Sequence, residues 1–157
     1  MSLFTDIRDL ADNKFQKESW WRSQLFFYLN GRGVDSVMPG MAVTFRYNAT
    51  TGEKMKFWDR YPMVYIIGED ATHFWGANVH YLVPGQRFQG FSPNPPQQTL
   101  HKYLRSNVLS PLYRIENSEF DDIGLIPSEE FVTTINGRNV RVPRTVIYSQ
   151  LLSLIHI

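Results

Sequence analysis

The stretch "FWDRYPMVYII" (Phe57–Ile67) places an Asp-Arg pair and a Tyr-Pro step directly before an unbroken apolar run. Proline restricts the residue before it to extended backbone, so Pro62 holds Tyr61 in that conformation. Asp59 is a residue type whose side chain hydrogen-bonds nearby backbone in turns. The apolar run that follows has the length and character of a strand covered on both faces. We therefore expect a corner that leads a strand into the core. A reactive Asp59–Arg60 pair is disfavoured, because neighbouring residues of extended chain point to opposite faces.

Segments with strand character lie on both sides of this corner. Residues 42–47 ("AVTFRY") alternate between apolar and polar positions, and residues 72–82 ("THFWGANVHYL") form a longer aromatic run. Gly76 within that run indicates a bulge or a close approach of another backbone. Near the C-terminus, Asn136-Gly137 joins two alternating runs and predicts a hairpin, because a type I′ turn needs positive φ at both central positions. Short strands and short turns favour a small, strongly bent antiparallel β-sheet or an SH3-like barrel.

Three segments are predicted to be helical. The first lies within the first 15 residues, and the second ("SWWRSQLFFYLNG", residues 19–31) begins at the cap residue Ser19 and ends at an Asn-Gly step. The third covers residues 97–109, where apolar side chains recur at helical spacing before Pro111. The fold class is therefore α+β, with N-terminal helices and one later helix.

Two further segments carry local signals. Ser128, which is followed by two glutamates, has the character of a capped helix start. Residues 83–98 ("VPGQRFQGFSPNPPQQ") are rich in proline and glycine and are expected to form a surface loop.

The chain of 157 residues suits one domain. We expect that domain to span residues 1–151, with a helical segment over 1–31, a β core over 40–83, and a helix and hairpin over 97–149. The closing "LSLIHI" (residues 152–157) resembles the translation of a sequencing-library adapter end. It predicts a non-native tail on a gene of metagenomic source.

Composition excludes several classes of function. The chain has no cysteine, so disulfides, thiolate metal sites and a cysteine nucleophile are ruled out. Its 16 Lys and Arg against 15 Asp and Glu give a net charge of +1, which by itself does not indicate nucleic-acid binding. No apolar run approaches the ~20 residues of a membrane span. We therefore expect an intracellular chain with no membrane partner.

No motif of a catalytic or metal site is present. His73 and His80 stand at an odd separation in one predicted strand, which places them on opposite faces and outside any metal-ligand spacing. The acidic residues Glu119, Asp121 and Asp122 lie in a polar connection. The chain contains no nucleotide-binding glycine loop and no nucleophile elbow. We expect no enzyme activity, no cofactor and no small-molecule substrate.

Cations interleaved with aromatic residues form the main candidate for a binding surface. Such a surface can follow a phosphate backbone while its rings stack on bases or on a terminal base pair. The candidates are a first group of Arg46, Lys54, Lys56, Trp58 and Arg60, and a second group on the C-terminal hairpin of Arg138, Arg141 and Arg144. The same residues also suit an ordinary solvated face of a sheet, so both interpretations stay open.

The second predicted helix carries apolar residues on nearly every side. Trp20, Trp21, Phe26 and Phe27 leave it little polar surface. It therefore needs to be buried either by the rest of the domain or by a partner protein. These four residues are candidates for partner binding, with burial in the core as the alternative.

Residues 39–131 resemble a family of small proteins of contractile-tailed bacteriophages, the DNA end protector proteins. In that family a "YYDRFPL" step precedes an apolar strand, and a "GFxGLNLHYL" segment closes the block. Here the corresponding segments are "FWDRYPM" (residues 57–63) and "FWGANVHYL" (residues 74–82). The later "HKYLRSNVLSPLYRIENSEFDDIGLIPSEEFV" (residues 101–132) is similar to the family's "KHYLNSxVxSxFxxIxxxEWxIAxFLPxExF". The chain departs from the family pattern in its leading strand and in lacking a longer helical insert.

The resemblance implies a virion protein, assembled in the host cytoplasm, that binds the ends of packaged double-stranded DNA and blocks exonucleases. It implies binding without catalysis, and contact with other phage virion proteins. A structural connector in head completion or in tail or baseplate assembly, without DNA binding, is the alternative. The family motifs assign no DNA-contacting residues, so the candidates above rest on charge and aromatic placement alone.

Overall fold

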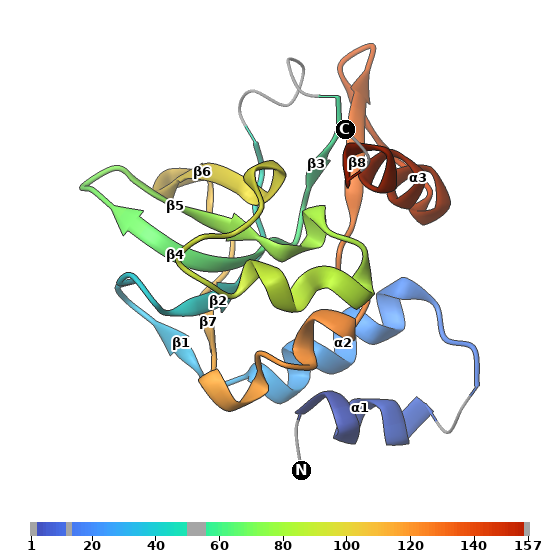
Figure 1. Ribbon diagram of the computed structural model, residues 1–157, viewed down its shortest axis with the longest axis horizontal. Helices are drawn as coiled ribbons and strands as arrows, with labels where there is room; N and C mark the ends of the chain where they lie inside the picture. Colours follow the sequence, from blue (N-terminus) through green and yellow to red (C-terminus); the bar gives the residue numbers. More distant parts are fainter. Residues whose placement is uncertain (1–2, 12–13, 50–55, 156–157) are drawn as a thin grey trace.

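The computed structural model describes residues 3–11, 14–49 and 56–155 (Figure 1). Its α-helices are α1 (Leu3–Ala11), α2 (Glu18–Leu29) and α3 (Arg144–Ile155). Its strands are β1 (Gly33–Val34), β2 (Ala42–Thr44), β3 (Trp58–Asp59), β4 (Met63–Glu69), β5 (His73–Asn78), β6 (Leu100–Leu104), β7 (Leu112–Ile115), β8 (Phe131–Ile135) and β9 (Arg138–Arg141). Within these ranges, no helix has the length and apolar character needed to cross a bilayer.

The strands form two antiparallel sheets. The larger has six strands in the order β1-β7-β2-β4-β5-β6, and the smaller has three in the order β3-β8-β9. The larger sheet is open, with β1 and β6 as its edges, although a single bridge between Tyr47 and Val108 links the segments that follow β2 and β6. The predicted α+β class and antiparallel sheet are confirmed, whereas the closed barrel alternative is wrong.

The predicted corner joins β3 of the small sheet to β4 near the centre of the large one. Asp59 Oδ1 accepts a hydrogen bond from the Tyr61 amide at 3.0 Å, which confirms the expected turn contact. Pro62 then leads directly into β4. Met63 packs in the apolar cluster on one face of the sheet and Val64 in the cluster on the other. The prediction that this strand is covered on both faces is therefore confirmed.

Three apolar clusters hold the elements together. The first fills the space between the large sheet and α1 and α2, and contains Leu25 and Leu29 of α2. The second lies on the opposite face of the sheet, where Phe45 makes edge-on contacts with neighbouring rings. The third joins the small sheet to α3 through Phe131 and Ile147. Figure 1 shows the resulting arrangement, with α1 and α2 below the large sheet and α3 beside β8.

Gly76 is confirmed as a point of close approach between β4 and β5. A Cβ at this position would overlap the carbonyl oxygen of Tyr65 on the neighbouring strand. The bulge lies on that neighbouring strand, where the register shifts between Ile66 and Gly68. The bulge places Gly68 opposite Trp75, on the neighbouring strand.

The C-terminal hairpin is confirmed. Asn136 has φ 53° and Gly137 has φ 77°, as a type I′ turn requires. The pairing of Ile135 with Arg138 closes the turn, and β8 pairs on its other side with β3. Sequence analysis missed α3, which continues through Ile155 and packs on this small sheet.

The predicted helix over residues 97–109 is wrong. This segment forms β6, which pairs with β5, with single 3₁₀ turns before and after it. A helix would have buried Leu100 together with Tyr103, but Leu100 is 46% exposed and Tyr103 is buried. Pairing with the open edge of β5 satisfies the backbone of this segment, and that tertiary contact overrides the local helical pattern.

Two other local predictions are also wrong. Ser128 does not start a helix, because residues 127–130 have no regular secondary structure and lead into β8. Residues 83–98 are not simply a surface loop, since Pro84–Gly90 forms a 3₁₀ helix in which Arg87 is fully buried.

Candidate nucleic-acid interface

The first predicted group of cations does not form one exposed surface. Trp58 is only 3% exposed, so its ring is unavailable for stacking on a base. Lys54 lies outside the described residues. Lys56 and Arg46 are exposed, and neither forms an ion pair with another residue that the structure describes. Of this group, Lys56 and Arg46 are therefore the residues best placed to meet a ligand.

Arg60 is held by a carboxylate. Its Nη1 lies 3.0 Å from Glu130 Oε1, and the other oxygen of Glu130 binds Arg22 Nη2 at 2.8 Å. Arg22 also lies over the ring of Tyr61, 4.5 Å from its centre. Arg60 thus belongs to a bridge between the corner, α2 and the segment before β8, and part of its charge is neutralised there.

The second predicted group is divided in the same way. Arg141 Nη2 lies 2.8 Å from Glu18 Oε2, and Arg144 Nε lies 3.4 Å from the other oxygen of Glu18. These contacts fasten the hairpin and α3 to the start of α2. Arg138, next to the turn, is exposed and has no ion pair within the described part of the chain.

Two cations that sequence analysis left out lie on or near the edge strand β6. Lys102 is exposed and stands opposite Trp75, with its Nζ 5.4 Å from the centre of that ring. Arg105 forms a longer ion pair, 3.5 Å, with Glu69. The wrong helix prediction over 97–109 kept Lys102 and Arg105 from being recognised as candidates. In a strand, by contrast, alternation places Lys102 on the exposed side. The alternation of exposed Lys102 with buried Tyr103 is the signal that could have found it.

Three of the exposed cations, Lys56, Lys102 and Arg138, lie on or next to elements on the side of the molecule away from α1. Figure 1 shows β3, β6 and the β8–β9 hairpin at the end away from α1. The strands β3 and β6 approach closely enough to line a common cavity of about 50 Å³. Lys56 lies two residues before β3, Lys102 lies on β6, and Arg138 begins β9. We call these three residues the cationic end.

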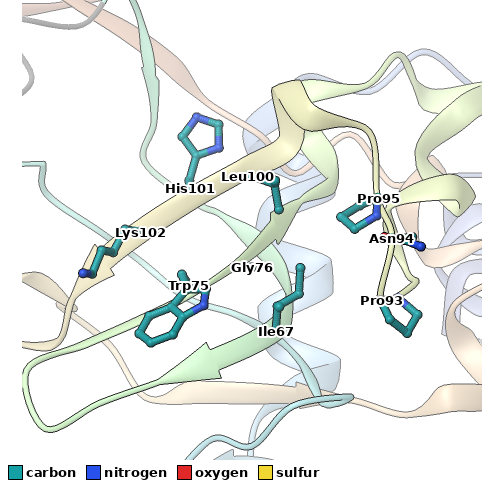
Figure 2. A pocket seen from close by; sticks show the side chains of 9 residues that line it. All are labelled: Ile67, Trp75, Gly76, Pro93, Asn94, Pro95, Leu100, His101 and Lys102. Atoms are coloured by element: carbon teal, nitrogen blue, oxygen red, sulfur yellow. The ribbon is translucent and has the colours of Figure 1, made fainter.

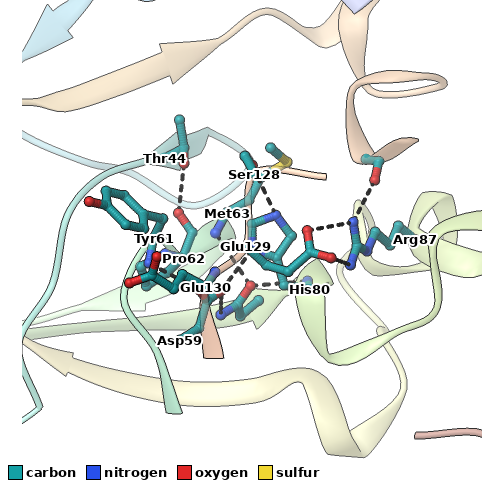
Figure 3. A network of polar contacts seen from close by, with 12 residues as sticks. Thr44, Asp59, Tyr61, Pro62, Met63, His80, Arg87, Ser128, Glu129 and Glu130 are labelled. Atoms are coloured by element: carbon teal, nitrogen blue, oxygen red, sulfur yellow. Dashed lines mark hydrogen bonds and ion pairs between the residues drawn. The ribbon is translucent and has the colours of Figure 1, made fainter. Parts of the chain in front are cut away.

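A buried polar network centres on Asp59 (Figure 3). Its Oδ2 lies 2.7 Å from His80 Nδ1 and accepts a hydrogen bond from Asn78 Nδ2 at 3.1 Å. Its Oδ1 accepts the backbone N–H groups of Tyr61 and Glu130, at 3.0 and 3.2 Å. Because a carboxylate only accepts, His80 carries a proton on Nδ1. The network joins the corner, the end of β5 and the segment before β8.

This network contains the residue types of a Ser-His-Asp triad. The second ring nitrogen of His80 lies 3.4 Å from Ser128 Oγ. However, His80 and Ser128 are fully buried, and neither lines the cavity beside Trp75, the cavity between β3 and β6, or the cavity beside Phe15. A nucleophile has to contact its substrate. The arrangement therefore acts as a structural network.

A second buried group lies beside the first. Arg87, which is 0% exposed, sets Nη2 3.1 Å from Glu129 Oε1 and donates to the carbonyl oxygens of Leu82 and Gly124. Tyr148 donates its hydroxyl proton to the same Glu129 oxygen at 2.6 Å. Burial by itself would raise the pKa of Glu129, but the Arg87 guanidinium holds that pKa well below its usual range. This pair ties the 84–90 segment to β8 and α3.

The aromatic residues proposed for partner binding have different environments. Trp20 and Trp21 are partly buried and pack edge to face, 5.1 Å between ring centres. Phe26 contacts Tyr61 and Tyr113. Phe27 is 74% exposed. Trp20 and Trp21 are thus partly buried against the domain, whereas Phe27 faces solvent, and partner binding by these residues stays a prediction.

The fold and the site define a small α+β protein with an apolar interior, two buried polar groups and a cationic end. Among the described residues, no three His, Asp or Glu side chains are grouped to hold a metal ion. Residues 2–94 match the family model described as Phage T4 terminal DNA protecting protein, and this match covers more than half of the chain. The chain therefore belongs to that family, which is a structural DNA-protecting family and not an enzyme family. No curated protein and no solved structure gave a match.

Proposed function

We propose that this chain is a virion protein that binds the ends of packaged double-stranded DNA through its cationic end and blocks exonucleases. The carrying observation is the family match combined with the placement of Lys56, Lys102 and Arg138. These three are exposed without an ion pair to another described residue, whereas Arg60 and Arg87 are paired with glutamates. Charges of this kind can replace counterions on phosphates, which internally paired arginines do less well.

The proposal requires that open DNA ends bind more tightly than DNA without ends. A short blunt duplex and a dumbbell of the same length, closed by a hairpin at each end, provide the comparison. We expect tighter binding of the blunt duplex by fluorescence anisotropy at low salt, and slower digestion of the bound duplex by an exonuclease. Equal affinity for the dumbbell, or no binding at low salt, would overturn the proposal.

Removing charge from the cationic end should weaken this binding. For the double variant Lys56→Gln/Arg138→Gln, we expect lower affinity and a slope of log K against log salt that is smaller by about two, one for each lost phosphate contact. The matched control is Lys14→Gln/Lys17→Gln, which removes two exposed cations before α2, at the other end of the molecule. An equal loss in both variants would show that the effect is one of net charge, not of this surface.

A structural connector without DNA binding is the second candidate. Phe15 is 93% exposed and Phe27 is 74% exposed, and a cavity of about 510 Å³ lies beside Phe15 and Trp20. Exposed aromatic residues next to a hollow suit a protein interface. Unchanged phage assembly with a Phe15→Ser/Phe27→Ser variant would rule this candidate out, and loss of assembly with intact DNA-end binding would favour it.

A further inference from the structure

A cavity of about 480 Å³ lies between the Pro-rich segment 93–95 and the face of β4, β5 and β6 that carries Trp75 (Figure 2). It was not foreseen from the sequence. Its size falls within the range of about 300–1,000 Å³ that is usual for small-molecule sites. None of its lining residues is acidic, and one, Lys102, is a cation. The cavity therefore favours an anionic ligand.

Trp75 forms a fixed aromatic floor on one side of this cavity. Its ring lies across the backbone at Gly68, since a Cβ on that glycine would overlap the indole. The shift in register between Ile66 and Gly68 places that glycine opposite Trp75. Trp75 is half-buried and lines the cavity. A ring held in this way can stack on a planar ligand without a large loss of side-chain freedom.

Apart from Asn94 and His101, the remaining walls are apolar, and the cation stands at one end. Leu100, on the edge strand, is 46% exposed and faces the cavity with Ile67. Figure 2 shows Pro93 and Pro95 on the opposite side, and Lys102 next to Trp75. A planar ring that entered between these walls would keep its negatively charged substituent near the Lys102 ammonium group.

We infer that this cavity binds one unpaired nucleotide at a DNA end, with the base stacked on Trp75 and its phosphate at Lys102. The inference deepens the proposed function and rests on it. Lys102 belongs to the cationic end and also lines the smaller cavity between β3 and β6, so the pocket adjoins the surface proposed to meet the duplex. A terminal nucleotide joins an aromatic base to a phosphate, and stacking on an aromatic side chain accepts any base.

Duplexes that carry one unpaired 2-aminopurine nucleotide at each end test this inference. We expect the wild-type protein to bind them about tenfold more tightly than blunt duplexes, and to quench the 2-aminopurine fluorescence. Trp75→Leu should abolish both the preference and the quenching while leaving the affinity for blunt ends unchanged. Lys102→Gln should weaken binding to blunt ends as well, because Lys102 belongs to the cationic end, and should weaken binding to overhanging ends more strongly. Phe27→Leu is the matched control, because it removes an exposed aromatic ring from α2, outside the pocket.

The outcomes separate this inference from the proposed function. Equal affinity for blunt and overhanging ends, or a preference that survives Trp75→Leu, would overturn the pocket assignment and leave end binding intact. Free 2-aminopurine deoxynucleoside monophosphate provides the second readout. If Trp75 is needed to quench it while dumbbell and open duplex bind equally, then end binding is overturned and the pocket remains a nucleotide site. Thermal unfolding of Trp75→Leu checks that the variant is folded.

Discussion

Replacing Arg87 by methionine is expected to lower the free energy of unfolding by about 3–5 kcal/mol, as removal of one partner of a buried ion pair does. Arg87 is completely buried, and its guanidinium lies 3.1–3.3 Å from both oxygens of Glu129. Without it, a carboxylate that is 3% exposed keeps the Tyr148 hydroxyl as a close donor and one longer ion pair, 3.5 Å, to the half-buried Arg144. Urea denaturation at pH 7, followed by tryptophan fluorescence, measures the loss.

Arg60→Met is the matched control. Arg60 also pairs with a glutamate, but its side chain is 37% exposed and its partner Glu130 keeps a second contact to Arg22. We expect this change to cost only about 0–1 kcal/mol. The double variant Arg87→Met/Glu129→Gln should recover part of the loss, because the unpaired buried charge is gone. Equal effects of Arg87→Met and Arg60→Met would contradict a structural role for the buried pair.

The dependence on pH follows from the direction of the Glu129 pKa shift. Burial raises this pKa, but Arg87 and the other groups around the carboxylate, among them the Tyr148 hydroxyl, together lower it by more, so the native pKa lies below the unfolded value of about 4.3. The stabilisation from the ionised carboxylate is therefore complete above the unfolded pKa and is lost as the pH falls through the native one. In Arg87→Met the buried carboxyl keeps only the half-buried Arg144 as a nearby cation, 3.5 Å away, so protonation relieves it. The difference in stability between the two proteins should narrow as the pH falls below about 5.

The elements that sequence analysis predicted correctly depend on short-range signals. The hairpin turn needs only Asn136 and Gly137 in positive φ, and two adjacent residues specify that. The corner needs Asp59 beside Pro62, and β4 needs an apolar run of strand length. In each case the physical cause lies within a few residues, so the pattern was sufficient.

The errors arise where distant partners decide the outcome. Arg87 stands in a Pro- and Gly-rich segment of loop composition, and its partner Glu129 follows 42 residues later. The segment that forms β6 satisfies a helical pattern, but it forms a strand because its backbone pairs with the open edge of β5. The candidate cations were recognised by charge alone. Which of them stay exposed depends on acids such as Glu18, which is more than 100 residues from Arg141.

Asp59→Asn is expected to lower the free energy of unfolding by about 2–3 kcal/mol, because it leaves a buried donor without an acceptor. The new side chain can still accept the two backbone N–H groups through its oxygen, but its NH₂ then faces His80 and Asn78. His80 can move its proton from Nδ1 to Nε2, so that Nδ1 accepts a hydrogen bond from the new NH₂ group. The side-chain amide of Asn78 cannot flip to present its oxygen, because that Oδ1 already accepts hydrogen bonds from the backbone amides of Met63 and His80. One conflict between donors therefore persists.

The control for this change is Asp70→Asn. Asp70 Oδ1 also accepts two backbone amides, from Thr72 and His73 at 2.9 and 2.7 Å, but it lies in an exposed turn. An asparagine there keeps both contacts and offers its NH₂ to water, so the expected change is within about 0.5 kcal/mol. Similar losses in the two variants would show that burial of the network is not what makes Asp59 important.

The tautomer of His80 gives a second readout that distinguishes this network from general packing. Nitrogen NMR should find the proton on Nδ1 in the wild-type protein, where Asp59 accepts it, and on Nε2 in Asp59→Asn. Below its unfolding temperature, the variant should bind DNA ends with unchanged affinity, since phosphate contacts come from surface cations that the network does not include. Loss of end binding in a folded Asp59→Asn protein would contradict this separation. It would mean that the network positions the cationic end as well as holding the core.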